Sequence, residues 1–124
     1  MLKDAFIINK VFASNGEMVD TPIFVCPQGA EYEVVEVNER HTTAGSNGGA
    51  VTMNLVKAAD AVAVAGATTL LQSEFDMKST VDTLVRKTTA NSGLVTAQAT
   101  RTLTGGQALG LDFTGTLTAL AGVV

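Results

Sequence analysis

The sequence predicts an all-β protein: a jelly-roll-like antiparallel β-sandwich of about eight strands in a single domain. Apolar and polar residues alternate along many short runs, most clearly over 108–117, where Leu109, Leu111 and Phe113 share one face. No segment carries a sustained helical stripe of apolar residues with capping residues at its ends. Turns of very unequal length separate the runs, which favours a jelly roll over a regular meander.

Length and composition indicate one folded domain. The chain has 124 residues, with 46% hydrophobic and 16% charged residues. This size can bury a core, and the low charge leaves a surface built mainly from uncharged polar residues. No linker or internal repeat interrupts the chain, so residues 1–124 are assigned to one domain, in which Met1 to Lys3 could form a short N-terminal arm.

The first two strands are expected at 6–12 and 23–26. Phe6, Ile8 and Phe12 share one face of the first run, and its other face is also partly apolar, which predicts a strand covered on both sides. The second run lies between two prolines, which lack a backbone donor and favour a sheet edge.

A long strand is expected over 32–43. Its apolar phase changes between Val34 and Val35, which predicts a β-bulge there. After the Gly-rich loop 44–50, the alternation of 51–55 predicts a half-buried strand.

The Ala-rich stretch 58–67 is predicted to be a loop with at most one helical turn, because alternating Val and the glycine within it disfavour a longer helix. Alternation then predicts strands over 71–77 and 81–85, followed by a turn at 91–93. A final pair of strands, at about 94–104 and 107–117, completes the set.

The end of the chain carries a resemblance to a known group of proteins. The final strands are joined at Gly105-Gly106, the second contains LGLDFTGTLT over 109–118, and the small-residue run AGVV follows at 121–124. This combination resembles the C-terminal strands of small jelly-roll proteins that decorate tailed-phage heads, including head-fibre-type proteins. Two earlier blocks extend the resemblance: AVTMNLVK at 50–57 and TTLLQSEFDMKST at 68–80.

The resemblance implies a capsid decoration, or cement, protein. Such proteins assemble as trimers on the outer capsid surface of the virion, at threefold or quasi-threefold positions, and clamp neighbouring subunits of the major capsid protein. It implies a homotrimer made in the host cytoplasm. Similar proteins commonly carry a further alternating strand after the position of 121–124, so a neighbouring subunit is expected to cover an unpaired edge there.

Charge argues against two classes of partner. Eight Lys and Arg against twelve Asp and Glu give a net charge of −4, so no basic field exists to hold nucleic acid. The start of the chain lacks the features of a secretory signal. The longest apolar stretch, 58–71, contains Asp60 and is too short to span a membrane. We therefore expect no nucleic acid or membrane partner.

The sulfur-containing residues are expected in the core. Cys26 is the single cysteine, which excludes an intrachain disulfide, and no neighbouring base or cation activates it, so a buried thiol is predicted. Met18, Met53 and Met77 occupy strand-like positions and are predicted to fill the core rather than to bind copper.

His41 is the single histidine and the strongest candidate for chemistry. With Glu36 or Glu39 it could form half of a metal site, but the metal sites of cupins, which share the jelly-roll architecture, use two or more His and a Glu. No serine lies in a G-x-S-x-G motif that would indicate a catalytic triad. A structural or solvated role is predicted for His41.

The Gly-rich loops at 45–49 and 105–106 carry no Lys-Ser or Lys-Thr pair and open no helix, so they are predicted to be turns rather than phosphate sites. The sequence accordingly predicts no catalytic, cofactor-binding or metal-binding residues, no cofactor and no enzymatic activity.

Two carboxylate pairs and a single tyrosine complete the candidates. Glu31 with Glu33, and Glu74 with Asp76, lie two residues apart and share a strand face, as in two-acid hydrolysis, but solvated strand faces are expected. Tyr32 is the only aromatic residue besides five Phe, which offers a poor platform for sugars, so a carbohydrate-binding adhesion domain is a secondary alternative.

A head-fibre base or a tail β-module is the closer alternative to decoration. For contacts with a partner, the long loops 44–50 and 58–67 are the candidates, because long loops often carry contacts.

Overall fold

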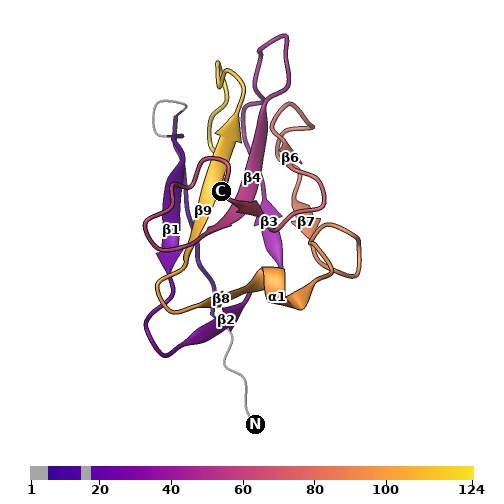
Figure 1. Ribbon diagram of the computed structural model, residues 1–124. Helices are drawn as coiled ribbons and strands as arrows, with labels where there is room; N and C mark the ends of the chain where they lie inside the picture. Colours follow the sequence, from indigo (N-terminus) through magenta and orange to yellow (C-terminus); the bar gives the residue numbers. More distant parts are fainter. Residues whose placement is uncertain (1–5, 15–17) are drawn as a thin grey trace.

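The computed structural model describes residues 6–14 and 18–124, so the predicted arm at Met1 to Lys3 lies outside the described residues. Nine strands and one four-residue helix confirm the predicted all-β, antiparallel sandwich class (Figure 1). The elements are β1 (Thr21–Val25), β2 (Glu31–Glu33), β3 (Val37–Glu39), β4 (Thr52–Ala58), β5 (Thr68–Thr69), β6 (Phe75–Asp76), β7 (Val85–Lys87), α1 (Gln98–Arg101), β8 (Thr102–Thr104) and β9 (Ala108–Thr114).

The largest sheet has the order β1-β9-β4-β5, with β6 also paired to β4 (Figure 1). β4 and β9 pair along their full length, from Thr52 opposite Thr114 to Ala58 opposite Ala108. β1 lies at the edge of this sheet, as the flanking prolines predict. On the other side of β4, β5 pairs only with Val56 and Lys57, and β6 only with Thr52 and Met53.

β4 was expected to be half-buried, and this expectation is wrong because both of its faces are covered. Val56 is fully buried, and on β9 its partner Gly110 has no side chain. The space is filled by Val64 from the following loop, and the Gly66 N–H donates to Asp112 Oδ2 at 3.1 Å. Residues 59–67 thus form the predicted loop, without a helical turn, folded over the outer face of the sheet.

The single strand predicted over 32–43 is instead two strands. β2 pairs with β8, whereas β3 pairs with β7, and residues 34–36 between them belong to neither ladder. The change of phase at Val34 and Val35 therefore marks a break in the strand rather than a bulge. Arg101 fixes the break, because its backbone carbonyl accepts from Val34 N–H at 3.0 Å and its guanidinium donates to the Val34 carbonyl at 3.1 Å.

The strand predicted at 6–12 is also wrong. Residues 6–11 form no ladder, and this stretch is joined to a neighbour at Phe12, which forms a bridge with Val123. The segment passes behind β9 in Figure 1 and belongs to a second, irregular layer of the sandwich. A second bridge in that layer joins Thr43 to Ala121.

The later strands are shorter than predicted. Over 71–77 the ladder is confined to Phe75 and Asp76, with a single bridge from Leu71 to Leu94, and over 81–85 it begins only at Val85. The final two strands do not pair with each other: β8 joins β2, and β9 joins β1 and β4. The predicted turns at Gly105-Gly106 and at 91–93 are confirmed.

The core lies between the layers. Cys26 is 1% exposed and is free of any disulfide, and Met18, Met53 and Met77 are all buried, as predicted. The Cys26 thiol is 3.6 Å from the carbonyl oxygen of Leu103 on β8. The residue that follows β1 therefore contacts the ladder of β2 and β8.

Candidate binding cleft

A large apolar cleft opens between the first sheet and the second layer. Its volume is about 1290 Å³. The floor comes from the inner face of the first sheet, where alternation on β4 and β9 places Met53, Leu55, Leu109 and Leu111 on the same side. These four side chains belong to the hydrophobic core and are only 2–7% exposed, so the open surface of the cleft comes mainly from its walls and rim.

Two stretches of irregular backbone form the long walls of the cleft. One wall is the N-terminal segment, residues 6–12, and the other is residues 34–40, which include β3. Residues 123 and 124 lie between the walls at one end of the cleft: Phe12 and Val123 exchange backbone hydrogen bonds of 2.8 and 3.1 Å, and Arg40 and Val124 exchange bonds of 3.1 and 2.9 Å.

Several apolar side chains at the rim of the cleft are exposed. Ile7 is 92% exposed, and Val35 and Leu84 are 64% and 62% exposed. Phe6 and Val124 are about half exposed. Apolar side chains gathered around one cleft are typical of a surface that binds another molecule.

An aromatic cluster lies in the cleft. The ring centroid of Phe6 is 5.4 Å from that of Phe24 and 5.0 Å from that of Tyr32, and the Phe24 and Tyr32 centroids are 5.5 Å apart. The sequence pattern did not predict this cluster, because the three residues come from three separate segments. The tilted and edge-to-face geometry is one that aromatic rings prefer.

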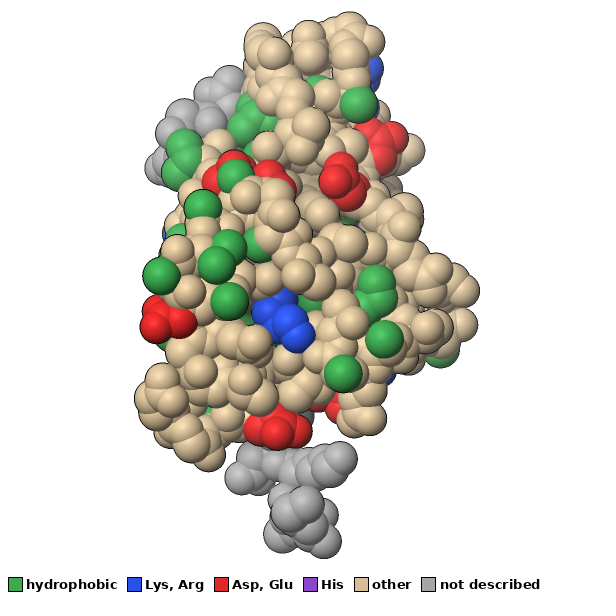
Figure 2. Space-filling model, viewed as in Figure 1, with side chains coloured by type: hydrophobic (Ala, Val, Ile, Leu, Met, Phe, Trp, Pro, Cys, Tyr) green, Lys and Arg blue, Asp and Glu red, His purple; other side chains and the backbone are tan. Residues whose placement is uncertain are grey.

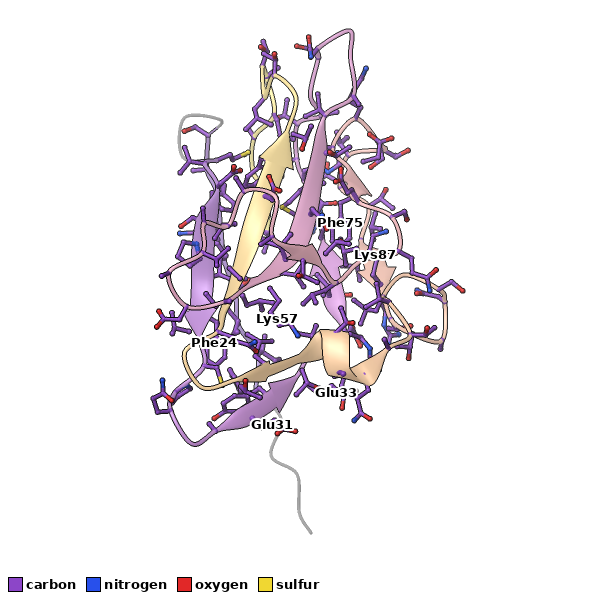
Figure 3. All side chains as sticks on the ribbon, in the orientation of Figure 1. Phe24, Glu31, Glu33, Lys57, Phe75 and Lys87 are labelled. Atoms are coloured by element: carbon purple, nitrogen blue, oxygen red, sulfur yellow. The ribbon has the colours of Figure 1, made fainter. Side chains whose placement is uncertain are left out.

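Acidic side chains flank this apolar surface. Glu33 accepts hydrogen bonds from the guanidinium of Arg101 and from the Gln98 amide. Glu36 accepts from Asn38 at 2.8 Å and from Arg86 at 2.9 Å, and these contacts hold the pKa of Glu36 below its ordinary value. Glu31 is exposed at the base of the molecule (Figure 3).

A smaller polar hollow of about 460 Å³ lies beside Lys57. The Lys57 ammonium group points from β4 toward α1 (Figure 3) and donates to the carbonyl oxygens of Ala99 and Thr102, both at 3.0 Å. These are carbonyls at the end of the short helix, so Lys57 acts there as a structural cap.

His41 lies outside both hollows and is fully buried. Its Nδ1 is 2.8 Å from Glu39 Oε1, and its Nε2 is 3.1 Å from the Ser79 carbonyl oxygen. A carbonyl can only accept, so Nε2 carries a proton and donates to it. The structure thus brings His41 together with Glu39, as one sequence alternative paired them, but in the interior, whereas Glu36 lies at the cleft.

The remaining candidates from the sequence, the pair Glu74 and Asp76 and the two long loops, lie outside the cleft. Glu74 and Asp76 are exposed, and Asp76 accepts from the backbone N–H of Lys78 at 2.9 Å. Neither of the long loops 44–50 and 58–67 lines the cleft. The first projects at one end of the sandwich, and the second covers the outer sheet face (Figure 1).

Over residues 6–14 and 18–124, no group of three or more His, Cys, Asp or Glu side chains is placed to hold a metal ion. No helix within the same ranges is long and apolar enough to cross a membrane. The face shown in Figure 2 is dominated by uncharged polar groups and backbone, with scattered apolar and few charged side chains.

The arrangement is therefore best described as a binding surface: an apolar cleft, an aromatic cluster at one part of it, and flanking acidic groups of which Glu33 and Glu36 already hold partners of their own. Searches for similarity found no protein-family model, curated protein or solved structure that matches this chain.

Proposed function

We propose that this protein is a non-enzymatic decoration protein of a tailed-phage head. It binds the outer surface of the capsid as a homotrimer and stabilises contacts between major capsid subunits. It is made in the host cytoplasm and resides on the virion. The resemblance of residues 51–124 to head decoration proteins suggests the class of partner.

The open apolar cleft is the observation that carries a binding role. Ile7, Val35 and Leu84 are each more than 60% exposed at its rim. Only 16% of the residues of the whole chain are charged, and the acidic side chains of Glu31, Glu33 and Glu36 lie beside the cleft. Such a surface suits a partly wet interface held by hydrogen bonds and apolar anchors.

A trimer gives such a surface a mechanical role. When three linked protomers bind adjacent capsid subunits, separating those subunits must break several contacts at once. Linked contacts raise retention by orders of magnitude without any single strong site. The capsid would then resist internal pressure better when it is decorated.

Co-sedimentation with undecorated heads of the source phage tests the proposal. We expect saturable binding at a fixed number of copies per capsid subunit, and a higher melting temperature of the decorated particle. Leu84→Asp at the cleft rim should weaken binding, whereas Val62→Asp, at a similarly exposed position in the loop 59–67, should not. No binding by the wild-type chain would overturn decoration and favour a head-fibre base or tail module.

The aromatic cluster favours a second candidate, carbohydrate binding for adhesion. Sugars stack on aromatic rings beside polar groups, and Phe6, Phe24 and Tyr32 lie together near Glu31 and Glu33. A glycan array separates the two candidates, because glycan binding that is lost in Tyr32→Ala would support adhesion instead.

A further inference from the structure

The Gly-rich loop between β3 and β4 contains an Asn-Gly pair, Asn47-Gly48. The loop projects at one end of the sandwich (Figure 1). In such a pair the backbone nitrogen of the glycine can approach the side-chain carbonyl carbon of the asparagine closely, because glycine has no Cβ atom and adopts a wide range of backbone conformations. Residues 44–50 carry no charged side chain, so a reaction that creates a charge there changes the character of the whole loop.

The attacking group, the backbone nitrogen of Gly48, is unrestrained. Its N–H has no hydrogen-bond partner within the part of the chain that the structure describes. Gly48 is exposed, and a Cβ atom added to it would meet no atom within 4 Å. Water and hydroxide therefore reach this nitrogen freely.

Hydrogen bonds anchor the loop on both sides of the pair instead. The Ser46 N–H donates to the carbonyl oxygen of Thr118 at 3.0 Å, and the Lys78 ammonium group donates to the carbonyl oxygen of Gly49 at 3.2 Å. The peptide link between residues 47 and 48 lies between these anchors. It can turn without breaking either of them.

The carboxamide of Asn47 is also unrestrained. Within the described residues no hydrogen bond holds its oxygen or its nitrogen. Its Nδ2 lies 3.5 Å from the position that a Cβ atom would take on Gly49, so the amide lies over the backbone that follows it. Both reacting groups, the Gly48 nitrogen and the Asn47 carboxamide, are thus free to meet.

Asn91 shows the opposite arrangement, although it is also exposed. Its Oδ1 accepts from the N–H groups of Thr88 and Gly93 at 2.9 and 3.0 Å, and its Nδ2 donates to the Arg86 carbonyl oxygen at 2.8 Å. Attack on its side-chain carbonyl carbon would have to break these three bonds. Exposure alone therefore does not make an asparagine of this chain reactive.

We propose that Asn47 is a site of spontaneous deamidation, which converts the neutral loop 44–50 into an acidic loop as the protein ages. The inference goes beyond the proposed function and does not depend on it. The reaction needs no enzyme, and water is its single co-reactant.

The reaction has two steps, and neither oxidises or reduces any atom. First, the Gly48 nitrogen loses its proton to hydroxide and bonds to Asn47 Cγ; the Cγ–Nδ2 bond breaks, Nδ2 takes a proton from water and leaves as ammonia, and a five-membered succinimide ring remains. Water then opens the ring, and the Gly48 nitrogen regains a proton. Cleavage of its bond to Cγ gives aspartate at position 47, whereas cleavage of its bond to the backbone carbonyl carbon gives isoaspartate.

The product carries a new negative charge close to a cation. The Asn47 amide lies over Gly49, whose carbonyl oxygen accepts from Lys78, so the new carboxylate forms near the Lys78 ammonium group. The net charge of the chain becomes one unit more negative than −4. In isoaspartate the backbone runs through Cγ, which adds one carbon atom between the two anchors of the loop.

Timed incubation of the full chain at mildly alkaline pH, followed by tryptic mass spectrometry, tests the site. Trypsin releases residues 41–57, with Asn47, and residues 88–101, with Asn91, as separate peptides, and a second Asn-Gly pair at 15–16 falls in a third. We expect the mass gain of amide-to-acid conversion at Asn47, as both aspartate and isoaspartate. Its rate should exceed that at Asn91 by about tenfold or more.

Two substitutions separate the effect of structure from that of the following residue. Ser92→Gly gives Asn91 a glycine as well, at a position where φ is already 60°, a value that glycine adopts without strain. In this folded variant Asn91 should still react about tenfold more slowly than Asn47, because hydrogen bonds hold its amide. In urea, where these bonds are lost, the two rates should be similar.

The second substitution, Gly48→Ala, adds a Cβ atom that meets no neighbour, so the fold should not change. It should slow the reaction at Asn47 by about tenfold, because the side chain crowds the attacking nitrogen. Two results would overturn the proposal. One is an unmodified 41–57 peptide in folded protein after a time that converts the urea-unfolded chain, and the other is equal rates at Asn47 and Asn91 in folded Ser92→Gly.

Discussion

At the scale of single residues, the interior holds two titratable groups whose burial has consequences for stability. Glu39 and His41 are both fully enclosed and share a short contact of 2.8 Å. His41 Nε2 carries the proton that it donates to the Ser79 carbonyl oxygen. The contact between Glu39 Oε1 and His41 Nδ1 needs one further proton, which lies either on the carboxyl group or on Nδ1. In both cases the Glu39–His41 pair has no net charge. The second oxygen of Glu39 has no hydrogen-bond partner among the described residues.

Replacing Glu39 should change how stability depends on pH. Burial raises the pKa of Glu39 above its ordinary value of 4.5, although the hydrogen bond to His41 partly opposes this. The folded state therefore holds the proton more tightly than the unfolded state, so this stabilising contribution is complete below about pH 4.5 and is lost as pH rises through the folded pKa.

In urea unfolding from about pH 4 to about pH 7, the free energy of unfolding of the wild type should fall relative to that of Glu39→Gln. Parallel pH profiles for the two proteins would contradict this assignment.

Lys87 is a buried cation without a carboxylate partner in the described structure. It is 8% exposed, and its ammonium group lies 4.9 Å from the centroid of the Phe75 ring and 3.2 Å from Ser73 Oγ (Figure 3). Burial lowers the pKa of Lys87, so the charged form is less favoured in the folded state. Lys87→Met keeps the stem and removes the charge, and should raise the free energy of unfolding by about 1 kcal/mol at neutral pH.

Lys57→Met is the matched control for this prediction. Lys57 donates to two carbonyl oxygens, so the same substitution there should lower the free energy of unfolding by about 1 kcal/mol. Chemical denaturation of both variants measures the two signs. Destabilisation of both proteins by the same amount would show that the charge of Lys87 is as well satisfied as that of Lys57.

At the scale of elements, the covering of β4 and β9 depends on a loop and a glycine. A Cβ atom added at Gly110 would lie 2.7 and 2.8 Å from the two methyl groups of Val64. Gly110→Ala should therefore displace the loop 59–67 and lower the free energy of unfolding by about 1–3 kcal/mol. The nearest obstruction is a side chain, so adding Val64→Ala should recover part of the loss.

Thermal unfolding of the two single variants and the double variant completes a double-mutant cycle. Gly48→Ala is the control, since a Cβ there meets no atom within 4 Å. Additive effects of the changes at Gly110 and Val64 would contradict the proposed packing of the loop on β9.

At the scale of the whole molecule, the predicted homotrimer has a direct test. Apolar side chains away from the cleft, among them Val19 and Val25, are also exposed in a single copy, and burial of such surface is the main driving force for association. Sedimentation equilibrium should give three times the monomer mass of 12.8 kDa. A monomer at all concentrations would rule out a stable trimer in solution and leave assembly on the capsid as the remaining route.

The sequence alone determined the class of fold and several local features. Period-two alternation identified β4 and β9, the prolines identified β1 as an edge strand, and low polarity placed Cys26 and the three methionines in the core. These features depend on short-range physics: the pleat of a strand, the missing donor of proline, and the transfer of small apolar groups out of water.

Only the tertiary structure decided where alternating runs become strands. A run forms a ladder only if another backbone lies beside it, so 6–12 and 71–77 remain largely unpaired despite their patterns, and 32–43 divides between two partners. The cleft was beyond prediction for the same reason, because its walls and floor come from segments that are distant in the chain. Alternation of apolar and polar residues indicates that a segment can pair with another strand. The packing of the whole chain determines whether it does so and which surface remains open for a partner.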